Sequence, residues 1–340
     1  MTHQRAFHDS LGHAASLVSR CLLPPRLTRG VGLAVAALAD QLIPDPPNAL
    51  HPVAWFGRWA GWLEARMWAD SRARGVLFTA VALTPLAALG AGLEMLTRRH
   101  PLAHLTATAV AGWVVLGAGS LEREGAAMAG HLERGELPAA RTRLGHLCGR
   151  LAEDLDEPEL ARAAVESMAE NTADSAIASL WWGSIAGIPG LLVHRGANTL
   201  DAMVGHRNAR YAHFGTASAR LDDLLDLAPA RLTAALAALV SPVVHGHPGQ
   251  VARIVARDAH AHPSPNGGWC EAAWAGALGV QLGGHNVYPG GIAEDRGLLG
   301  DGPRPRAGEL RRAARLVRWV TLAAAALALG AGALTARSGR

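Results

Sequence analysis

The sequence predicts an all-α, polytopic integral membrane protein with broken or re-entrant segments and a polar site on the cytoplasmic side. Half of its 340 residues are hydrophobic and only 18% are charged. Several apolar stretches reach the ~20 residues that cross a bilayer as a helix. The polar residues that could take part in binding or catalysis lie between those stretches. This composition excludes disorder, collagen and a solvated coiled coil, and it disfavours an ordinary soluble enzyme.

Three apolar stretches predict transmembrane helices. Residues 75–96 and 102–120 are separated by a short polar turn and predict a helical hairpin. Residues 316–335 form the third stretch, and arginines crowd its N-terminal end as expected for a cytoplasmic flank. Together these stretches predict a multi-pass membrane protein.

Three further apolar stretches are shorter or interrupted: 31–43, 176–193 and 230–245. Each is compatible with a half-crossing, a re-entrant helix or a buried soluble-type helix. Residues 1–28 contain polar positions throughout and no run resembling a signal sequence, so we expect a flexible cytoplasmic extension. We expect residues 29–340 to form a single membrane-embedded helical domain.

The basic residues are unusual because all 32 are arginine. The absence of lysine removes Schiff-base chemistry and a P-loop lysine, so any phosphate must be bound by arginine, backbone N–H groups or a metal ion. The arginines flank apolar spans and form no basic stripe interleaved with aromatic residues, which argues against a nucleic-acid partner. Three well-separated cysteines support neither a disulfide framework nor a zinc site.

Residues 54–68 place Trp55, Trp59 and Trp62 on one face of a predicted helix. Tryptophan is enriched at membrane interfaces, which favours an interfacial helix.

Residues 159–178 carry a ladder of charged side chains at a spacing of four: Arg162, Glu166, Glu170 and Asp174. This spacing predicts that they share one helix face, where neighbouring carboxylates repel each other. A magnesium ion would relieve the repulsion, so Glu166, Glu170 and Asp174 are our candidate metal ligands. A solvated acidic helix face explains the spacing equally well.

Residues 194–223 combine guanidinium groups and carboxylates at high density, a pattern suited to a site that holds phosphate together with a divalent cation. We expect catalytic roles for Asp201, His206, Asp222 and Asp223. We expect phosphate or substrate binding by Asn198, Arg207, Arg210 and Arg220. A structural salt-bridge network is the alternative, and His206 suits a base or a capping residue.

Two proline-stiffened polar turns lead into apolar helices, PDPPNALHPVAWFGR near the start and HPSPNGGWCEAAWAGALGVQLGG later. Such turns are rigid, so neighbouring side chains can be aimed. With these two strings, SMAENTADS, NTLDAMVGHRNARY and SARLDD resemble the CobD/CbiB family, the adenosylcobinamide-phosphate synthases of cobalamin biosynthesis. The resemblance runs from about residue 31 to residue 335.

The resemblance implies an ATP-dependent amide ligation that joins a carboxylate of adenosylcobyric acid to (R)-1-amino-2-propanol or its O-phosphate. It implies Mg²⁺ with ATP, a corrinoid substrate, and an active site facing the cytoplasm. Within the two proline-stiffened turns, we expect His51 and Asn266 to contact substrate. The tryptophan face would alternatively stack on the corrin ring. Further partners are the lipid bilayer, a second copy in a homodimer, and other late cobalamin-pathway membrane enzymes.

Two other readings compete with this enzyme. Ionisable residues near broken helices also occur in transporters and sensors, and the related AmpE-like proteins are associated with signalling. A soluble all-helical protein is the third reading.

Overall fold

The computed structural model describes residues 24–206, 208–288 and 292–338, and it confirms an all-α architecture with one exception. The exception is an antiparallel hairpin of β1 (Leu282–Tyr288) and β2 (Ile292–Leu299), which the sequence analysis did not predict. Glycines at 283, 284 and 297 interrupt the alternation that normally marks strands.

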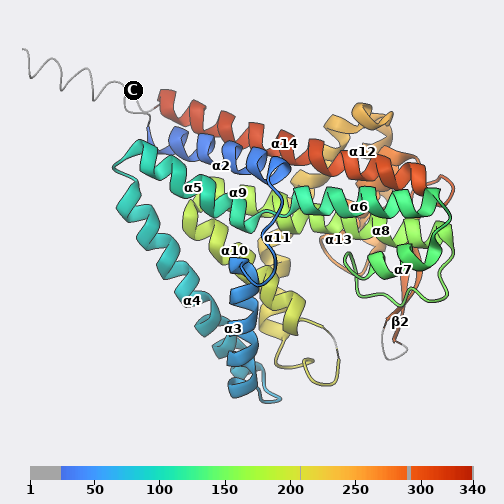
Figure 1. Ribbon diagram of the computed structural model, residues 1–340, viewed down its shortest axis with the longest axis horizontal. Helices are drawn as coiled ribbons and strands as arrows, with labels where there is room; N and C mark the ends of the chain where they lie inside the picture. The colour runs from blue at the N-terminus through green and yellow to red at the C-terminus, as the bar shows by residue number, and fades with distance from the viewer. Residues whose placement is uncertain (1–23, 207, 289–291, 339–340) are drawn as a thin grey trace, which may run out of the picture.

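The other elements are helical, and Figure 1 shows their arrangement. In chain order they are α2 (Pro25–Leu42), α3 (Pro52–Met67), α4 (Arg72–Thr97), α5 (Pro101–Val115), α6 (Ala118–Glu133), α7 (Leu137–Leu144), α8 (Glu157–Thr172), the π-helical turn η1 (Ala173–Ile177), α9 (Ala178–Ala186), α10 (Ile188–Val204), α11 (Thr216–Val240), η2 (Ser241–Val244), α12 (Pro248–Asp258), η3 (Ala259–Ala261), α13 (Gly267–Leu278) and α14 (Ala307–Ser338).

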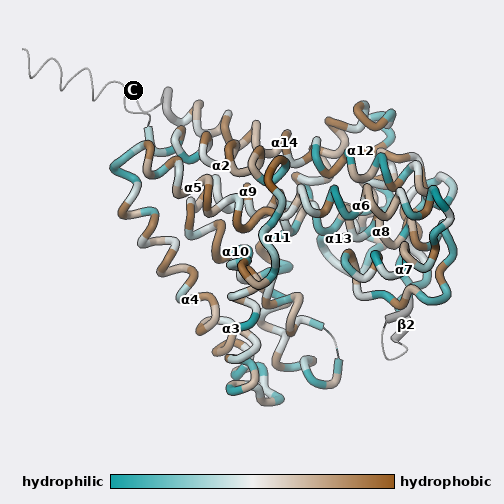
Figure 2. The backbone as a smooth tube through the Cα atoms, viewed as in Figure 1, coloured by the Kyte–Doolittle hydropathy of each residue, from teal (hydrophilic) through white to brown (hydrophobic). Residues whose placement is uncertain are grey.

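Four segments of the described chain are long and apolar enough to cross a membrane: Arg72–Thr97, Pro101–Glu133, Thr216–Val244 and Ala307–Thr335. They confirm the predicted hairpin and the predicted C-terminal span. The stretch 230–245, which was left open, belongs to a longer candidate span that begins at Thr216. The chain is therefore a polytopic helical membrane protein, and Figure 2 shows apolar residues along α4 and α5.

The stretch 176–193 is broken, as predicted. α9 ends at Ala186 and α10 begins at Ile188, and Gly187 between them has φ 72°, a conformation that glycine adopts at little cost. The Ile188 N–H donates to Glu94 Oε2 of α4 at 3.0 Å, which satisfies one of the unpaired amides at the start of α10. Neither half qualifies as a membrane span on its own.

The predicted N-terminal extension ends too late at residue 28. Its first 23 residues lie outside the described part of the chain, but residues 25–28 already belong to α2. Pro25 suits the first helical turn, where its missing N–H has no helical partner to lose. Thr28 and Gly30 are fully packed, so the helical domain begins at Pro25.

Close contacts at glycines show how α2, α5 and α14 run relative to one another. A Cβ on Gly112 would lie 2.6 Å from the Cβ of Ala36, and Gly32 faces Thr108 in the same way, so α2 and α5 run parallel in close contact. Gly332 faces the backbone of Arg26, so α14 runs opposite to α2. The start of α2, the α4–α5 turn and the end of α14 therefore lie together, and we call this the hairpin end.

Helices α6 and α8 pack against α14, and α7, α12, α13 and the β-hairpin surround them at the right in Figure 1; together they form the polar end. Arg311 in the first turns of α14 pairs with Glu133 at 2.6 Å, which ties α6 to this region. A continuous core of leucine, alanine and valine side chains joins the polar end to the apolar helices. A smaller core around Phe78 and Phe214 joins α3, α4, α10 and α11.

This arrangement predicts that the hairpin end and the polar end lie on opposite sides of the membrane. In a cysteine-free background, with Cys21, Cys148 and Cys270 replaced by serine, Arg99→Cys at the hairpin end and Glu153→Cys at the polar end place thiols at exposed positions. We expect an impermeant maleimide to label Arg99→Cys in intact cells and Glu153→Cys only after permeabilisation. Identical labelling of both variants from outside would contradict the arrangement.

Candidate functional site: an acidic cavity at the polar end

Six carboxylates line one cavity of about 160 Å³ between α8, η1, α10, α11 and the start of α13. They are Glu170, Asp174, Asp201, Asp222, Asp223 and Asp226, and Ser264 and Asn266 complete the polar lining. Five of the six belong to residues that the sequence analysis selected. The geometry therefore brings together motifs that lie up to about ninety residues apart in the chain.

A π-helical turn places Asp174. The regular α8 ends at Thr172, and residues 173–177 form one wider turn before α9 begins. A π turn inserts a residue into the helical repeat and so rotates the residues around it relative to the preceding helix. Glu170 and Asp174 both line the cavity, whereas Glu166 does not.

Helices α10 and α11 supply the other four carboxylates. Asp222 and Asp226 lie one turn apart on α11, and Asp201 approaches them from α10. His194 of α10 holds Asp226, because its Nε2 lies 2.8 Å from Asp226 Oδ1 while its Nδ1 lies 3.3 Å from Ser179 Oγ. Both ring nitrogens of His194 are thus engaged, which fixes the orientation of the carboxylate.

The polar turn before α13 closes the cavity and is rigid. The Ser264 N–H donates to His262 Nδ1 at 3.0 Å, and Ser264 Oγ accepts from the amides of Asn266 and Gly267. Asn266 Nδ2 donates to the Asp223 carbonyl oxygen at 2.8 Å. Arg231 Nη1 donates to Asn266 Oδ1 at 3.0 Å, so a guanidinium orients the amide that faces the cavity.

The electrostatics of the cavity favour a bound cation. Burial raises the pKa of Asp174 well above its ordinary value, and the neighbouring Asp226 and Asp222 raise it further. Burial, followed by the charge of Asp223, raises the pKa of Asp201 to about 6. Asp222 Oδ1 is buried and has no hydrogen-bond partner among the described residues. Oxygen donors and an unsatisfied acceptor together suit a hard divalent cation.

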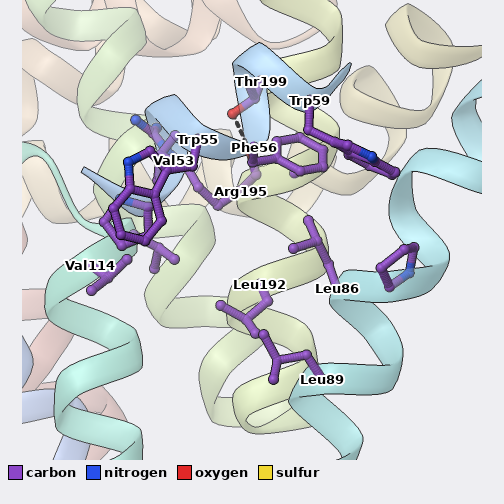
Figure 3. Close-up of a pocket in the computed structure, with 14 residues that line it drawn as sticks. Val53, Trp55, Phe56, Trp59, Leu86, Leu89, Val114, Leu192, Arg195 and Thr199 are labelled. Atoms are coloured by element: carbon purple, nitrogen blue, oxygen red, sulfur yellow. Dashed lines mark hydrogen bonds between the residues drawn. The ribbon is translucent and has the colours of Figure 1, made fainter. Parts of the chain in front are cut away.

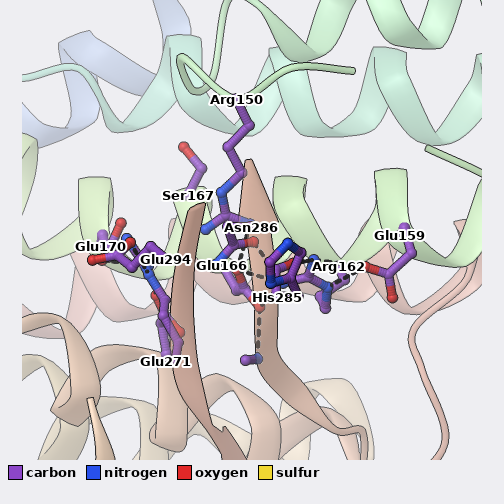
Figure 4. A network of polar contacts seen from close by, with 12 residues as sticks. Arg150, Glu159, Arg162, Glu166, Ser167, Glu170, Glu271, His285, Asn286 and Glu294 are labelled. Carbon is purple, nitrogen blue, oxygen red and sulfur yellow. Dashed lines mark hydrogen bonds and ion pairs between the residues drawn. The ribbon is translucent and has the colours of Figure 1, made fainter. Parts of the chain in front are cut away.

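Glu166 does not share this cavity, which corrects the prediction of one helix face for all three candidate metal ligands. It is fully buried and pairs with Arg150 at 2.6 Å and Arg162 at 3.1 Å, as Figure 4 shows. Glu166 Oε1 also accepts the Gly283 N–H of the β-hairpin at 2.7 Å. Its role in the structure is to join α8 to the hairpin.

A second group of carboxylates lies beside the cavity but is poorly suited to a metal ion. Atoms of Glu170, His262 and Glu271 lie close together, yet Arg296 Nη1 already occupies the space between the acids, 2.9 Å from Glu271 and 3.4 Å from Glu170. His262 Nδ1 accepts the Ser264 N–H, so its proton resides on Nε2, which faces Glu271 at 3.4 Å. The group is therefore an ion-paired cluster that supports Glu170.

Of the predicted phosphate-binding arginines, the two that the structure describes, Arg210 and Arg220, do not line the cavity. Arg207 lies outside the described residues. Arg210 pairs with Glu64 of α3 at 2.7 Å and stacks on Trp68, and Arg220 is exposed and does not line the cavity. The local density of charges in the sequence did not reveal which arginines face inward.

The remaining predicted residues surround the cavity. Asn198 lies within hydrogen-bonding reach of Asp222, and His206 is exposed just beyond the end of α10, where its charge acts on Asp201. His51 caps α3 by accepting the Val53 N–H at 3.2 Å, and its charged neighbours are Asp45 and Arg195. His51 does not line the acidic cavity.

Arg195 connects the acidic cavity to an apolar one. Burial lowers the pKa of the Arg195 guanidinium, and Asp174, Asp45 and Asp222 oppose that shift by their charge. The same side chain is the one charged group lining an apolar cavity of about 360 Å³ between α3, α4, α5 and α10. Figure 3 shows Trp55, Phe56 and Trp59 around this cavity. Trp62, which was predicted on the same face, does not line this cavity, and it is half-exposed like Trp55.

Sequence reasoning missed Asp226, His194, Arg195 and Arg231. A usable signal existed for two of them, because Asp226 follows Asp222 by one helical turn and His194 precedes Asn198 by one turn. Arg195 lies in the charge-dense segment and Arg231 lies between apolar residues, and only the packing of α10 and α11 shows what the two guanidinium groups face.

The fold and the cavity define a class: a polytopic helical membrane protein with a buried carboxylate site at its polar end. The chain belongs to the CobD/Cbib protein family, whose sequence profile matches residues 33–317. The chain is therefore a member of an enzyme family of cobalamin biosynthesis, which favours an enzyme over a transporter, a sensor or a soluble protein.

Several curated relatives carry the description "Cobalamin biosynthesis protein CobD". One from Mycobacterium tuberculosis is 45% identical over 303 residues, covering 89% of this chain and 95% of its own length. Another from Geobacter metallireducens is 47% identical over 269 residues, covering 77% and 83%. A third from Rhodobacter capsulatus is 39% identical over 294 residues, covering 84% and 91%. No solved structure matches the chain.

The buried Glu166 predicts a loss of stability when its charge is removed. In Glu166→Gln, Arg150 and Arg162 lose their common partner, which typically costs roughly 3 to 5 kcal/mol when a buried pair is broken. Denaturant unfolding in detergent measures the change, and the exposed Glu153→Gln is the control, expected within about 0.5 kcal/mol of wild type.

The pH dependence of that loss follows from the pKa of Glu166. Burial alone would raise this pKa, but Arg150 and Arg162 hold it below its ordinary value. The stabilisation is therefore present above the unfolded pKa and lost as the pH falls through the folded pKa. The difference between Glu166→Gln and wild type should shrink in acid, and equal stability at neutral pH would contradict the assignment.

Proposed function

We propose that this protein catalyses the ATP-dependent ligation of (R)-1-amino-2-propanol, or its O-phosphate, to a carboxylate of adenosylcobyric acid. Family membership supports the pathway. The observation that carries the chemistry is the cavity with six carboxylates, because an ATP-dependent ligase needs a site for Mg²⁺ next to its nucleotide.

The donors of the cavity fit magnesium. They are oxygen atoms of carboxylates, a hydroxyl and an amide, and Asp222 Oδ1 has no other partner among the described residues. Asp174, Asp222 and Asp226 would hold the ion, with Glu170 at the rim. When bound, magnesium neutralises charge on the phosphoryl oxygens of ATP.

The proposed reaction has two steps. An oxygen of the corrinoid carboxylate attacks the terminal phosphorus of ATP, ADP leaves, and an acyl phosphate forms. The amine of aminopropanol then attacks the acyl carbon, phosphate leaves with the C–O bond electrons, and the nitrogen loses a proton. Asp201 lines the cavity and has a pKa of about 6, so its carboxylate is mostly ionised at neutral pH and suits the role of proton acceptor.

The chain also offers groups that orient anions. Arg231 holds Asn266 towards the cavity, and Arg195 lies between the carboxylates and the apolar cavity. In a chain without lysine these guanidinium groups are the donors at hand for phosphate or substrate carboxylate. In the proposed topology the polar end faces the cytoplasm of a bacterial inner membrane, where ATP is available.

The carboxylate site predicts a loss of ligation when one acid becomes an amide. We expect Asp174→Asn and Asp222→Asn to lower amide formation by about 100-fold or more, since each removes an electrostatic group from the reaction centre. Mass spectrometry of the product from adenosylcobyric acid, Mg²⁺-ATP and each aminopropanol form measures the rate. Asp154→Asn, at an exposed position, is the matched control. Wild-type rates in both cavity variants at limiting Mg²⁺ would refute the assignment.

Metal binding has a readout that does not require turnover. Mg²⁺ should raise the thermal midpoint of the wild-type protein, by a stabilisation that reaches about 2.7 kcal/mol at a hundred times its Kd. Without Mg²⁺, Asp222→Asn should be at least as stable as wild type because it removes one of the crowded charges. The variant should respond weakly to Mg²⁺, and a full response would place the ion elsewhere.

The two groups of arginines predict different effects. Arg231→Lys keeps the charge but loses the planar fork that orients Asn266, so we expect a KM raised by about tenfold for ATP or the aminopropanol substrate. Arg210→Lys, at an exposed ion pair with Glu64, should leave the kinetics within about twofold of wild type. The reverse pattern would move phosphate binding to the segment around Arg210.

A further inference from the structure

A second charged cavity lies at the hairpin end, on the opposite end of the molecule from the carboxylate site. Its volume is about 670 Å³, and α2, α4, α9 and α14 form its walls. Its charged lining residues are Arg26, Arg29, Glu94 and Arg98. The enzyme reaction proposed above makes no use of these residues.

The charge of this cavity is positive because its one carboxylate is already neutralised. Glu94 Oε1 accepts from Arg29 Nη2 at 2.7 Å and lies 3.1 Å from His104 Nε2, and Glu94 Oε2 accepts the Ile188 N–H. Arg26 and Arg98 remain at the rim, exposed and without an ion pair or side-chain hydrogen bond in the described part of the chain. The Nε of Arg29 is buried and has no partner there either.

The rest of the lining is apolar and leaves room for a chain of methylene groups. Leu33, Ile185, Ala328 and Ala331 face the cavity, and the half-exposed Ile185 opens it towards the outside of the helix bundle. Gly332 belongs to the same wall, so α14 presents small residues there. Guanidinium groups at one end and an apolar wall behind them match an amphiphile with an anionic head.

The position of the cavity relative to the membrane indicates which kind of amphiphile it would bind. Candidate membrane spans end at Thr97 and Thr335, and another begins at Pro101. The cavity is lined by Arg98 and Thr335, so it lies at the depth where spans leave the hydrocarbon and where lipid phosphates reside.

We propose that this cavity binds an anionic phospholipid, with its phosphodiester between Arg26 and Arg98 and one acyl chain along Ile185 and the small residues of α14. A zwitterionic lipid would bring a cationic amine to a site that is already positive, so it is disfavoured. The bound lipid would bridge α2, α4 and α14 at an end where the Arg29–Glu94 pair and close helix packing already join them.

Native mass spectrometry of the full-length protein in detergent tests the proposal. Delipidated protein is titrated with phosphatidylglycerol, phosphatidylcholine or glycerol 3-phosphate, and the bound fraction is read directly. Each arginine near an anionic lipid is worth roughly fivefold in binding, so Arg26→Gln with Arg98→Gln should weaken phosphatidylglycerol binding by about 30-fold. Arg99→Gln, exposed beside Arg98 but outside the lining, is the matched control and should bind like wild type.

A second measurement separates binding from misfolding. Phosphatidylglycerol should raise the thermal midpoint of wild type and of Arg99→Gln, but not that of the double variant. Without lipid, the midpoint of the double variant should match wild type because neither arginine has an ion pair among the residues that the structure describes. Equal lipid retention in the double variant and the control would overturn the proposal. Equal binding of phosphatidylcholine, or equal stabilisation by glycerol 3-phosphate alone, would overturn it as well.

Discussion

The central constraint on this structure is the repulsion among six carboxylates that helix packing forces into one small cavity. Burial raises the pKa of Asp174 and of Asp201, and the neighbouring carboxylates raise both further, so burial and like-charge repulsion together make this arrangement unfavourable. The surrounding scaffold must be stable enough to maintain the arrangement. Helix α8 provides that stability, because nearly all of it is buried among α6, α13 and α14.

Arginine side chains beside the cavity neutralise neighbouring carboxylates without occupying the cavity. Arg150 and Arg162 neutralise Glu166 on one side, and Arg296 neutralises Glu271 and part of Glu170 on another. Within the cavity, Arg296 contacts Glu170, whereas Asp226 is held by a histidine, His194. A site that is acidic inside and neutralised at its edges can bind and release a divalent cation, whereas a fully paired one could not.

Sequence patterns predicted the long apolar helices, the break near residue 187 and most of the cavity carboxylates, because those signals are local. They failed where the outcome depends on packing. The spacing of four predicted Glu166 beside Glu170 and Asp174, but Glu166 is buried against Arg150 and the β-hairpin and does not line the cavity. Arg210 belongs to the charge-dense segment yet pairs with Glu64, whereas Arg231 lies between apolar residues, and only the packing of α11 against α13 shows that it faces Asn266.

Helix α10 explains how an apolar membrane bundle and a polar site coexist. The break at Gly187 starts this helix inside the bundle, where Glu94 caps it, and it ends at the polar residues around Gly205. His194, Asn198 and Asp201 follow a spacing of four and three, so they share the face towards α11. Arg195 directly follows His194, so it lies on a different side of α10, where it lines the apolar cavity together with Trp55 and Phe56. One helix therefore separates the carboxylates from the apolar cavity, and a ligand with a large apolar body and one reactive carboxylate can meet both sides at Arg195.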